Sequence, residues 1–510
     1  MPFFEVSVGH RIANTVMSRI REEGIPLEVY PEVVRIYRAI QGEDNTHFIV
    51  EAASEDSAIG WTEAIKNVLA EAEATEHEVS PDEDEPPEPL DVYAKVGTWT
   101  KTAGVSTTVI TSLGLDSKPL KALFLWGTGV IGANSFNTYT THAGQVVGFS
   151  DGTNHRCLES AVEDNNTTMN TNFWFGNKVF ALSDATGSAS THHKEKATAG
   201  FDSDGFTLTW DGTTNNAAGG YLAIWGDDIT DVQIRDFVTD TTSAGIHEYD
   251  LDLNSKPDFG FFLYAPWAGG SLPAFADTDA GPSISVNAGQ SGVRNWFAHW
   301  ISEDGIGTSS TERKKRTRRV LGGVWDNQAL SEEAEFESWN DESIFLDWTP
   351  EPPEFNDSPC SAIFITGGKW DAGYFLQPSA GGTSPVGDVR SLLPDKHSVV
   401  KAVCVVSDGN IVNEGEGSNA HAKLSFGVTD GTNSVTTSID DQDGAAVSVN
   451  TSITYNNKLM STFTSAATAS SSTEDSACTI LDVATAGEFT VHYASSDGIP
   501  RQNLWFVLAA

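Results

Sequence analysis

One short pattern occurs three times, in the same order, along the C-terminal four-fifths of the chain. "GFTLTW" ending at Trp210, "SIFLDW" ending at Trp348 and "EFTVHY" ending at Tyr493 each alternate apolar and polar residues. Successive side chains of a strand point to opposite faces, so this alternation predicts a half-buried β-strand. A more continuously apolar run follows each copy after a polar loop: "YLAIWG", "AIFITG" and "LWFVLA". Three copies in matching order indicate an internal repeat.

Segments further upstream match at a similar spacing. "LDSKPLKALFLW", ending at Trp126, matches "LNSKPDFGFFLY", ending at Tyr264, with no gap and an offset of 138 residues. We therefore expect three diverged copies of one domain of about 138 residues. The other matches are "DKHSVVKAVCVV" ending at Val406, which needs a small insertion, "GFSDGTN" from Gly148 with "GVTDGTN" from Gly427 and a degenerate "HWISEDG" from His299, and "NKVF" at Asn177 with "NKLM" at Asn457.

Short alternating runs between Asp-Gly, Gly-Gly and Ser-Gly turns predict antiparallel β-sandwiches or jelly rolls in the repeats. The first 73 residues differ: apolar spacing predicts helix faces at 12–20 and 58–72, with strands at 27–30, 33–40 and 46–53 between them. The predicted fold class is mainly β, with a small N-terminal α+β module. The predicted domains are the module at 1–73, an acidic proline-rich stalk at 74–94, and repeats at 95–231, 232–371 and 372–510.

The stalk contains "SPDEDEPPEPLD", residues 80–91, with four prolines and six acidic residues. Proline fixes φ and like charges repel, so we expect an extended spacer of roughly 35 Å at ~3.1 Å per residue. A base, a stalk and a three-domain arm is the organisation that this predicts.

The chain carries 71 acidic and 30 basic residues, a formal charge of −41. Such a charge argues against nucleic acid as a partner. It suits either a solubility device or adaptation to molar salt, where the screening length falls to about 3 Å. Few lysines with many Thr, Ser and Gly resemble the composition of halophilic archaeal proteins.

No pattern indicates an enzyme, and no catalytic residue is assigned. Acidic pairs at Asp202 with Asp204 and at Asp227 with Asp228 are not repeated in the other copies, so we expect solvated turns there. No cofactor is predicted, although structural calcium or another cation stays open. The four cysteines lack C-x-x-C spacing and are expected to be small buried hydrophobes.

Six positive charges in seven residues, "RKKRTRR" at 313–319, stand out in this acidic chain. One interpretation is a solvated strand edge, where basic residues deter edge pairing. The other is a docking patch for an anionic partner, such as the acidic stalk of a neighbouring subunit or an anionic cell surface. The candidate partner-binding residues are Arg313, Lys314, Lys315, Arg316, Arg318 and Arg319.

Tryptophans at predicted loop ends suit either sugar-stacking platforms or core and inter-domain contacts, and we favour the core. They are Trp126, Trp174, Trp225, Trp267, Trp296 and Trp325.

No run of 18 apolar residues predicts a membrane span, and the N-terminus has no basic and apolar export signal. Tandem β-sandwiches usually work outside cells. The simplest expectation is release by lysis, as part of a virus particle.

The strand pair "GFDSDGFTLTW…YLAIWG" resembles repeats in surface and tail proteins of tailed viruses. With the acidic composition, the chain looks like a virion surface protein of a tailed virus infecting haloarchaea. The resemblance implies a non-enzymatic structural protein whose residues 1–73 dock on capsid or tail proteins. Three β-domains would then meet a host surface glycan or surface-layer protein.

A capsid vertex turret or spike, which would be a pentamer, is favoured. A tail fibre, which would be a trimer, or a baseplate arm stays open. The alternative from another class is a cellular glycan-binding or surface-layer adhesin.

Overall fold

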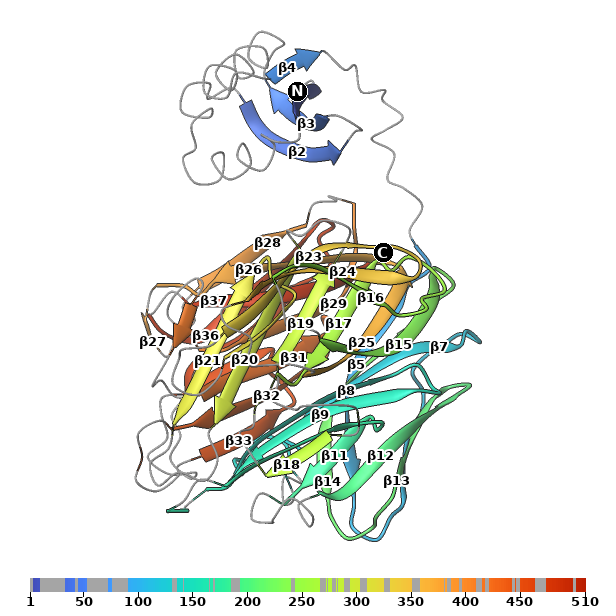
Figure 1. Ribbon diagram of the computed structural model, residues 1–510, viewed down its shortest axis with the longest axis vertical. Helices are drawn as coiled ribbons and strands as arrows, with labels where there is room; N and C mark the ends of the chain where they lie inside the picture. The colour runs from blue at the N-terminus through green and yellow to red at the C-terminus, as the bar shows by residue number, and fades with distance from the viewer. Residues whose placement is uncertain are drawn as a thin grey trace. The chain divides into compact units, whose positions relative to one another are not determined.

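In the computed structural model the chain forms two units, Met1–Pro89 and Leu90–Ala510 (Figure 1). In the first unit only four strands are described, as backbone: β1 (Phe3–Gly9), β2 (Val33–Gln41), β3 (Asn45–Ala52) and β4 (Ala72–Thr75). In the second unit the structure describes all residues except 131–134, 141, 165, 168–169, 185–192, 240–243, 267–271, 273, 278–280, 282, 289–293, 303–309, 325–330, 351–357, 380, 383–386, 394–396, 410–414, 418–421, 443–444, 446–449, 464–473 and 499–500.

The first unit contains an antiparallel sheet of order β2-β3-β1-β4, the strand order of a split β-α-β unit. The strands predicted at 33–40 and 46–53 are confirmed as β2 and β3. Ala72, predicted as the end of a helix, instead begins β4 because its backbone pairs with Val8. The helix faces before it, the strand predicted at 27–30 and most of the predicted stalk lie outside the described residues.

The second unit consists of three similar pairs of antiparallel sheets, and the predicted tandem β-sandwiches are confirmed. In each pair a six-stranded sheet faces a four-stranded one, and corresponding strands take corresponding places. The first repeat has β5 (Tyr93–Lys101), β7 (Leu120–Gly127), β8 (Ala143–Ser150), β9 (His155–Val162), β10 (Thr171–Gly176) and β14 (Ala217–Trp225) facing β6 (Thr107–Ile110), β11 (Phe180–Ser183), β12 (His193–Asp202) and β13 (Gly205–Trp210).

The second repeat has β15 (Ile229–Thr239), β17 (Phe259–Tyr264), β19 (Ser283–Ala288), β20 (Asn295–Ser302), β21 (Thr311–Thr317) and β25 (Ser358–Gly367) facing β16 (Gly245–Asp250), β22 (Leu321–Val324), β23 (Ser331–Trp339) and β24 (Ser343–Pro350).

The third repeat has β26 (Lys369–Leu376), β29 (Val400–Ser407), β31 (Ala422–Thr429), β32 (Ser434–Asp441), β33 (Asn450–Tyr455) and β37 (Gln502–Ala509) facing β28 (Gly387–Leu392), β34 (Met460–Phe463), β35 (Glu474–Asp482) and β36 (Glu488–Asp497), with the short β27 (Gly381–Gly382) also on β36.

The alternating runs that revealed the repeat are the strands β13, β24 and β36. In β13 the side chains of Phe206, Leu208 and Trp210 are buried, while Thr209 between them is exposed. Each repeat thereby fills the space between its two sheets with its own core.

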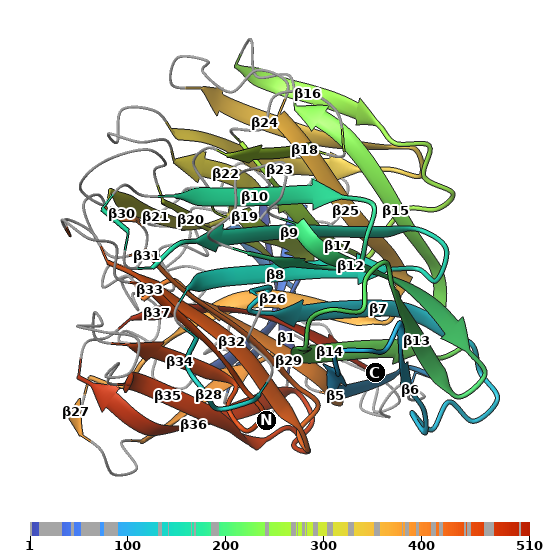
Figure 2. The same ribbon diagram turned by 90° about the horizontal axis from the view of Figure 1, so that it is seen from below.

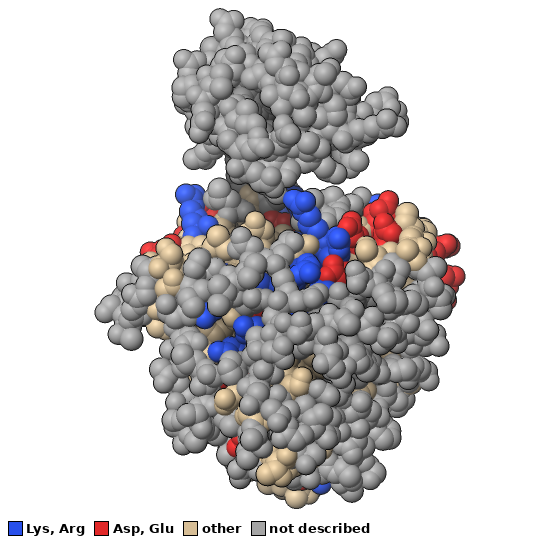
Figure 3. Space-filling view, turned by 60° about the vertical axis from the view of Figure 1, so that its left-hand side comes forward, with Lys and Arg blue, Asp and Glu red and all other residues tan. Residues whose placement is uncertain are grey.

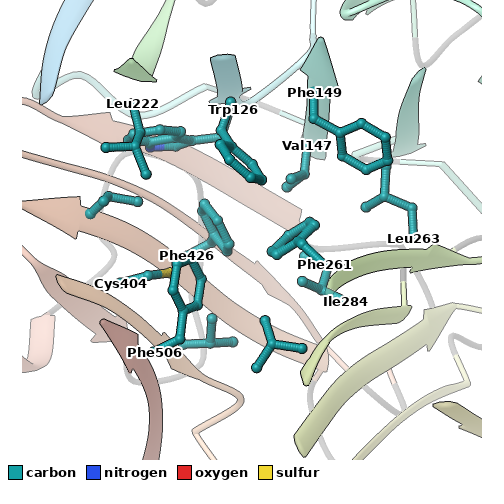
Figure 4. Close-up of a cluster of buried hydrophobic side chains, with 14 of the residues drawn as sticks. Trp126, Val147, Phe149, Leu222, Phe261, Leu263, Ile284, Cys404, Phe426 and Phe506 are labelled. Atoms are coloured by element: carbon teal, nitrogen blue, oxygen red, sulfur yellow. The ribbon is translucent and has the colours of Figure 1, made fainter. Parts of the chain in front are cut away.

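A further core joins all three repeats, because the outer face of each six-stranded sheet is also apolar. Phe261 of the second repeat lies 5.4 Å from Phe124 of the first and 6.2 Å from Phe426 of the third, between ring centroids. Figure 4 shows Phe261 and Phe426 in this cluster, together with Trp126 of the first repeat. We expected an arm of separate domains, but the three sandwiches instead pack around one shared core.

The repeats also exchange segments in a closed cycle (Figure 2). The connection after the third strand of the second repeat forms β18 (Ala274–Asp277), which pairs with β10 of the first repeat. The same connection in the third repeat forms β30 (Gly415–Gly417), which pairs with β21 of the second. In the first repeat it reaches the third, where Thr140 pairs with Ser452 on β33. Each repeat therefore covers the outer edge strand of another.

Both ends of this unit lie at the same end of its sheets. β5 and β7 lie on either side of β14 and both begin beside its end, at Trp225, and the C-terminus lies on the same side (Figure 1). The connections that contact other repeats follow β7, β17 and β29. They leave from the opposite end of the sheets, because these three strands run away from the end at which the termini lie.

Two of the matches used to align the copies are wrong. "HWISEDG" was matched to the turn between β8 and β9, but it begins in β20, the counterpart of β9, and so lies one strand further along. The ungapped match of Trp126 with Tyr264 fails because Lys121 is an extra, bulged residue in the first repeat. A shift of one residue turns a strand's side chains to the opposite face.

Candidate interaction sites between the repeats

The basic run forms most of β21, which lies inside a sheet. β21 pairs with β20 on one side and with β30 of the third repeat on the other, so that Arg313 lies opposite Gly417 and Lys315 opposite Gly415. The prediction of a solvated strand edge is therefore wrong. The counterpart of β21 in the first repeat is β10.

Lys315 and Asp408 form an ion pair between the second and third repeats. Lys315 Nζ lies 2.8 Å from Asp408 Oδ1, and neither side chain is exposed to solvent. The ammonium also donates to the Gln502 carbonyl at 2.7 Å, and Arg313 donates to the Asp408 carbonyl at 3.0 Å. Burial lowers the pKa of Lys315, while Asp408 opposes that shift. The pair compensates two charges that folding removes from water.

Three other residues of the run form ion pairs with one carboxylate, that of Glu333, within the second repeat. Lys314, also fully buried, lies 2.6 Å from Glu333 Oε1, and Arg316 lies 3.1 Å from the same oxygen. Arg319 reaches Glu333 Oε2 at 3.2 Å and also pairs with Glu335. Although burial opposes ionisation, these cations lower the pKa of Glu333.

The structure therefore divides the six candidate residues into two groups. Arg313, Lys314 and Lys315 are buried and contact other parts of this chain, which removes them from any external docking surface. Arg316 and Arg319 are partly exposed and ion-paired, and Arg318 is exposed with φ of 63°. On the face drawn in Figure 3, several described Lys and Arg side chains lie next to acidic ones. Docking stays a prediction for these three arginines alone.

The contact between the first and third repeats rests on the segment before β8. The Thr140 N–H donates to the Ser452 carbonyl at 2.8 Å, and the two hydroxyl oxygens lie 2.7 Å apart. The ring of Tyr139 packs edge-on against Phe463, and its hydroxyl lies 3.3 Å from that of Tyr455. We call this contact the seam.

Polar residues extend the seam. The Asn450 N–H donates to Asp164 Oδ1 at 2.8 Å, and its side-chain amide donates to the Glu163 carbonyl at 2.7 Å. The sequence interpretation missed these residues. The signal for them was the long connection that follows the third strand in all three copies, which no compact sandwich needs.

The turns after the fourth strands form a second set of contacts between repeats. Asp430, in "GVTDGTN", accepts a hydrogen bond from the Val96 N–H of β5 at 2.9 Å. Arg156 pairs with Asp236 of β15, and Arg294 Nε lies 3.3 Å from Asp371 Oδ1 of β26. Burial raises the pKa of Asp371 to about 6, against the effect of Arg294. The first edge strand of each repeat is thus also held by another repeat.

Several other candidates have structural roles. Trp126, Trp174, Trp225 and Trp296 are buried, as favoured, and Trp267 and Trp325 lie outside the described residues. All four cysteines are free and buried, which confirms their predicted packing role.

The acidic pairs bind backbone and hydroxyl groups of turns. Asp202 accepts from the Thr207 hydroxyl at 2.7 Å, and Asp204 accepts from the Ser112 N–H at 2.9 Å. Asp228 accepts from the Asp91 N–H at 2.5 Å, and Asp227 lies 3.5 Å from Lys118.

Among the described residues, no group of three His, Cys, Asp or Glu is arranged to hold a metal ion. No helix in that part of the chain is long and apolar enough to cross a membrane. Comparisons of the sequence with protein-family models and with curated proteins find no match. The described structure defines a fold: three interlocked β-sandwiches in one chain, preceded by a small separate unit.

Proposed function

We propose that this chain is a non-enzymatic structural protein of a virus particle, at the virion surface, anchored through its N-terminal unit and meeting the host with its β-sandwich body. The resemblance of the repeated strand pair to tailed-virus surface proteins suggests the class. The observation that carries the proposal is that both ends of the body lie at one end of its sheets. A tether at Leu90 leaves the opposite end, with the exchanged connections, free for a host glycan or surface-layer protein.

The interlocked body suits such an exposed position. Unpaired edge strands invite pairing with other chains, and here segments of other repeats cover β10 and β21. One chain already supplies three sandwiches around a common core, so a threefold head needs no trimer. This favours a vertex turret or spike, with one head on each subunit of a pentamer, over a trimeric tail fibre.

The proposal is tested by deleting residues 1–89. The remaining body should be folded and should still bind host cells or their isolated surface layer, while particles that carry the truncated gene should lack the protein. Incorporation of the truncated body into particles would reverse the roles of anchor and head. Full-length protein on cell surfaces, with none in purified particles, would favour the adhesin instead.

A further inference from the structure

His142 uses both its ring and its backbone at the seam between the first and third repeats. The Asp164 N–H donates a hydrogen bond to His142 Nδ1 at 3.0 Å. The His142 carbonyl accepts from the hydroxyl of Ser452, in the third repeat, at 2.7 Å. The same histidine therefore contacts the third repeat directly and holds a residue of the first repeat in place.

The residue that it holds is itself a seam contact. Asp164 presents Oδ1 to the Asn450 N–H, and Glu163 presents its carbonyl to the Asn450 side chain. A chain of hydrogen bonds thus runs from the His142 ring through Asp164 to β33. The direction of each bond is fixed, because a backbone N–H can only donate.

Side-chain hydrogen bonds make up a larger share of the contact at the seam than at the other two junctions between repeats. At the other two junctions, β18 pairs with β10 over four residues and β30 pairs with β21 over three. At the seam the described residues form one isolated bridge, Thr140 with Ser452, and one further backbone hydrogen bond, from the Asn137 N–H to the Thr454 carbonyl at 2.8 Å. Side-chain hydrogen bonds must supply what the ladder supplies at the other junctions.

We propose that His142 is a proton-sensitive latch: neutral His142 holds Asp164 against Asn450, and protonation of Nδ1 releases the first repeat from the third at the seam. A proton on Nδ1 would face the Asp164 N–H, so two donors would meet where one bond now exists. The ring must then turn away, and Asp164 loses the bond that fixes it.

The charged groups around the His142 ring determine the pH range over which the latch opens. Asp164, Glu163 and Asp184 favour the protonated ring, and Lys194 lies 3.4 Å from Asp184. From the third repeat the facing residues are Asn450 and Ser452, which do not titrate. Burial outweighs the carboxylates and lowers the pKa of His142 below its usual 6.5. The latch is therefore fully formed above pH 6.5 and is lost as the pH falls through the lowered value.

Hydrogen–deuterium exchange of the full chain between pH 8 and pH 5, corrected for intrinsic exchange, tests the latch. Around Thr140 and Ser452 we expect corrected exchange to rise several-fold on acidification, up to about tenfold for each unit by which the pKa is lowered. His142→Asn places a non-titrating acceptor close to the position of Nδ1. It should keep slow exchange at pH 8 and lose the acid response.

His155→Asn is the matched control. His155 is also a half-buried histidine with a lowered pKa caused mainly by burial, but its Nδ1 contacts Ser150 within the first repeat. This variant should keep the acid response at the seam. If His142→Asn does not fold, Asp164→Ala serves instead: it removes the Oδ1 that accepts from the Asn450 N–H, so the seam should exchange rapidly at both pH values. An acid-insensitive seam in the natural chain, or an acid response that survives in His142→Asn or Asp164→Ala, would overturn the latch.

Discussion

Lys315 of the second repeat and Asp408 of the third bury opposite charges 2.8 Å apart, with no exposed surface on either side chain. The pair lies beside the strands β21 and β30, which join these two repeats. A pair of this kind is costly to break because the remaining charge stays out of water. It makes the mutual position of the two repeats depend on both residues.

Removing one partner should therefore cost more than removing both. We expect Asp408→Ala to lower the free energy of unfolding by about 3 to 5 kcal/mol, and Lys315→Met with Asp408→Leu to recover most of that loss. Denaturant unfolding of the single and double variants measures both effects. The exposed Arg390, paired with Glu488, is the control, and Arg390→Met should cost less than about 1 kcal/mol. Equal losses in the single and double variants would contradict the argument.

Gly148, the first residue of "GFSDGTN", is required by close packing. A β-carbon there would lie 2.2 Å from the Val179 carbonyl oxygen and 2.6 Å from Cys157 Cβ. Gly148→Ala should destabilise the fold by about 1 to 3 kcal/mol, as measured by denaturant unfolding. Gly200, whose β-carbon position has no atom within 4 Å, is the matched control. Gly200→Ala should change stability by less than about 1 kcal/mol, and a similar loss at both sites would refute the packing explanation.

The sequence predicted the repeats well because each strand's alternation is a local property. It did not show which face of a strand meets another repeat, since the shared core and the separate cores are equally apolar. Trp126 and Tyr264 illustrate this limit: the bulge at Lys121 turns Trp126 into the shared core, whereas Tyr264 points into its own sandwich. Lys401 is bulged in the same way in the third repeat, where the sequence match needed an insertion.

The basic run shows a second limit. The positive charge of the run and its place in the sequence predicted that its side chains are exposed, because buried lysines are rare unless they are paired. Asp408 and Glu333, the carboxylates that pair with Lys315 and Lys314, lie far from one another in the sequence and carry no shared pattern. The contact between repeats brings Asp408 to Lys315, whereas the pairing of the two sheets of the second repeat brings Glu333 to Lys314.

Stability should rise with salt concentration. Screening reduces repulsion among the 71 acidic residues, so unfolding midpoints measured from ~0.1 to 3 M salt should climb. Salt screens the buried Lys315–Asp408 pair much less than it screens exposed charges. The unfolding midpoint of Asp408→Ala should therefore rise with salt at the same slope as that of the natural chain, from a lower value. A flat or falling series would remove the argument for adaptation to high salt.

Glu159 gives the fold a pH dependence of its own. It is fully buried in β9, and burial raises its pKa from 4.5 to about 8, against the effects of a hydrogen bond from Ser183 and the charge of Lys196. The folded chain therefore keeps a proton that the unfolded chain releases. The stability that this proton contributes is complete below pH 4.5 and is lost as the pH rises toward 8.

Glu159→Gln replaces the carboxyl with a neutral group of the same shape and should remove this dependence. Between pH 5 and pH 8 the natural chain should lose a few kcal/mol of unfolding free energy that the variant keeps, so the variant should be the more stable form at pH 8. Urea unfolding at constant ionic strength measures both profiles. The exposed Glu337→Gln is the control for the lost negative charge, and its profile should follow that of the natural chain. Parallel profiles for Glu159→Gln and the natural chain would show that Glu159 is ionised in the folded state.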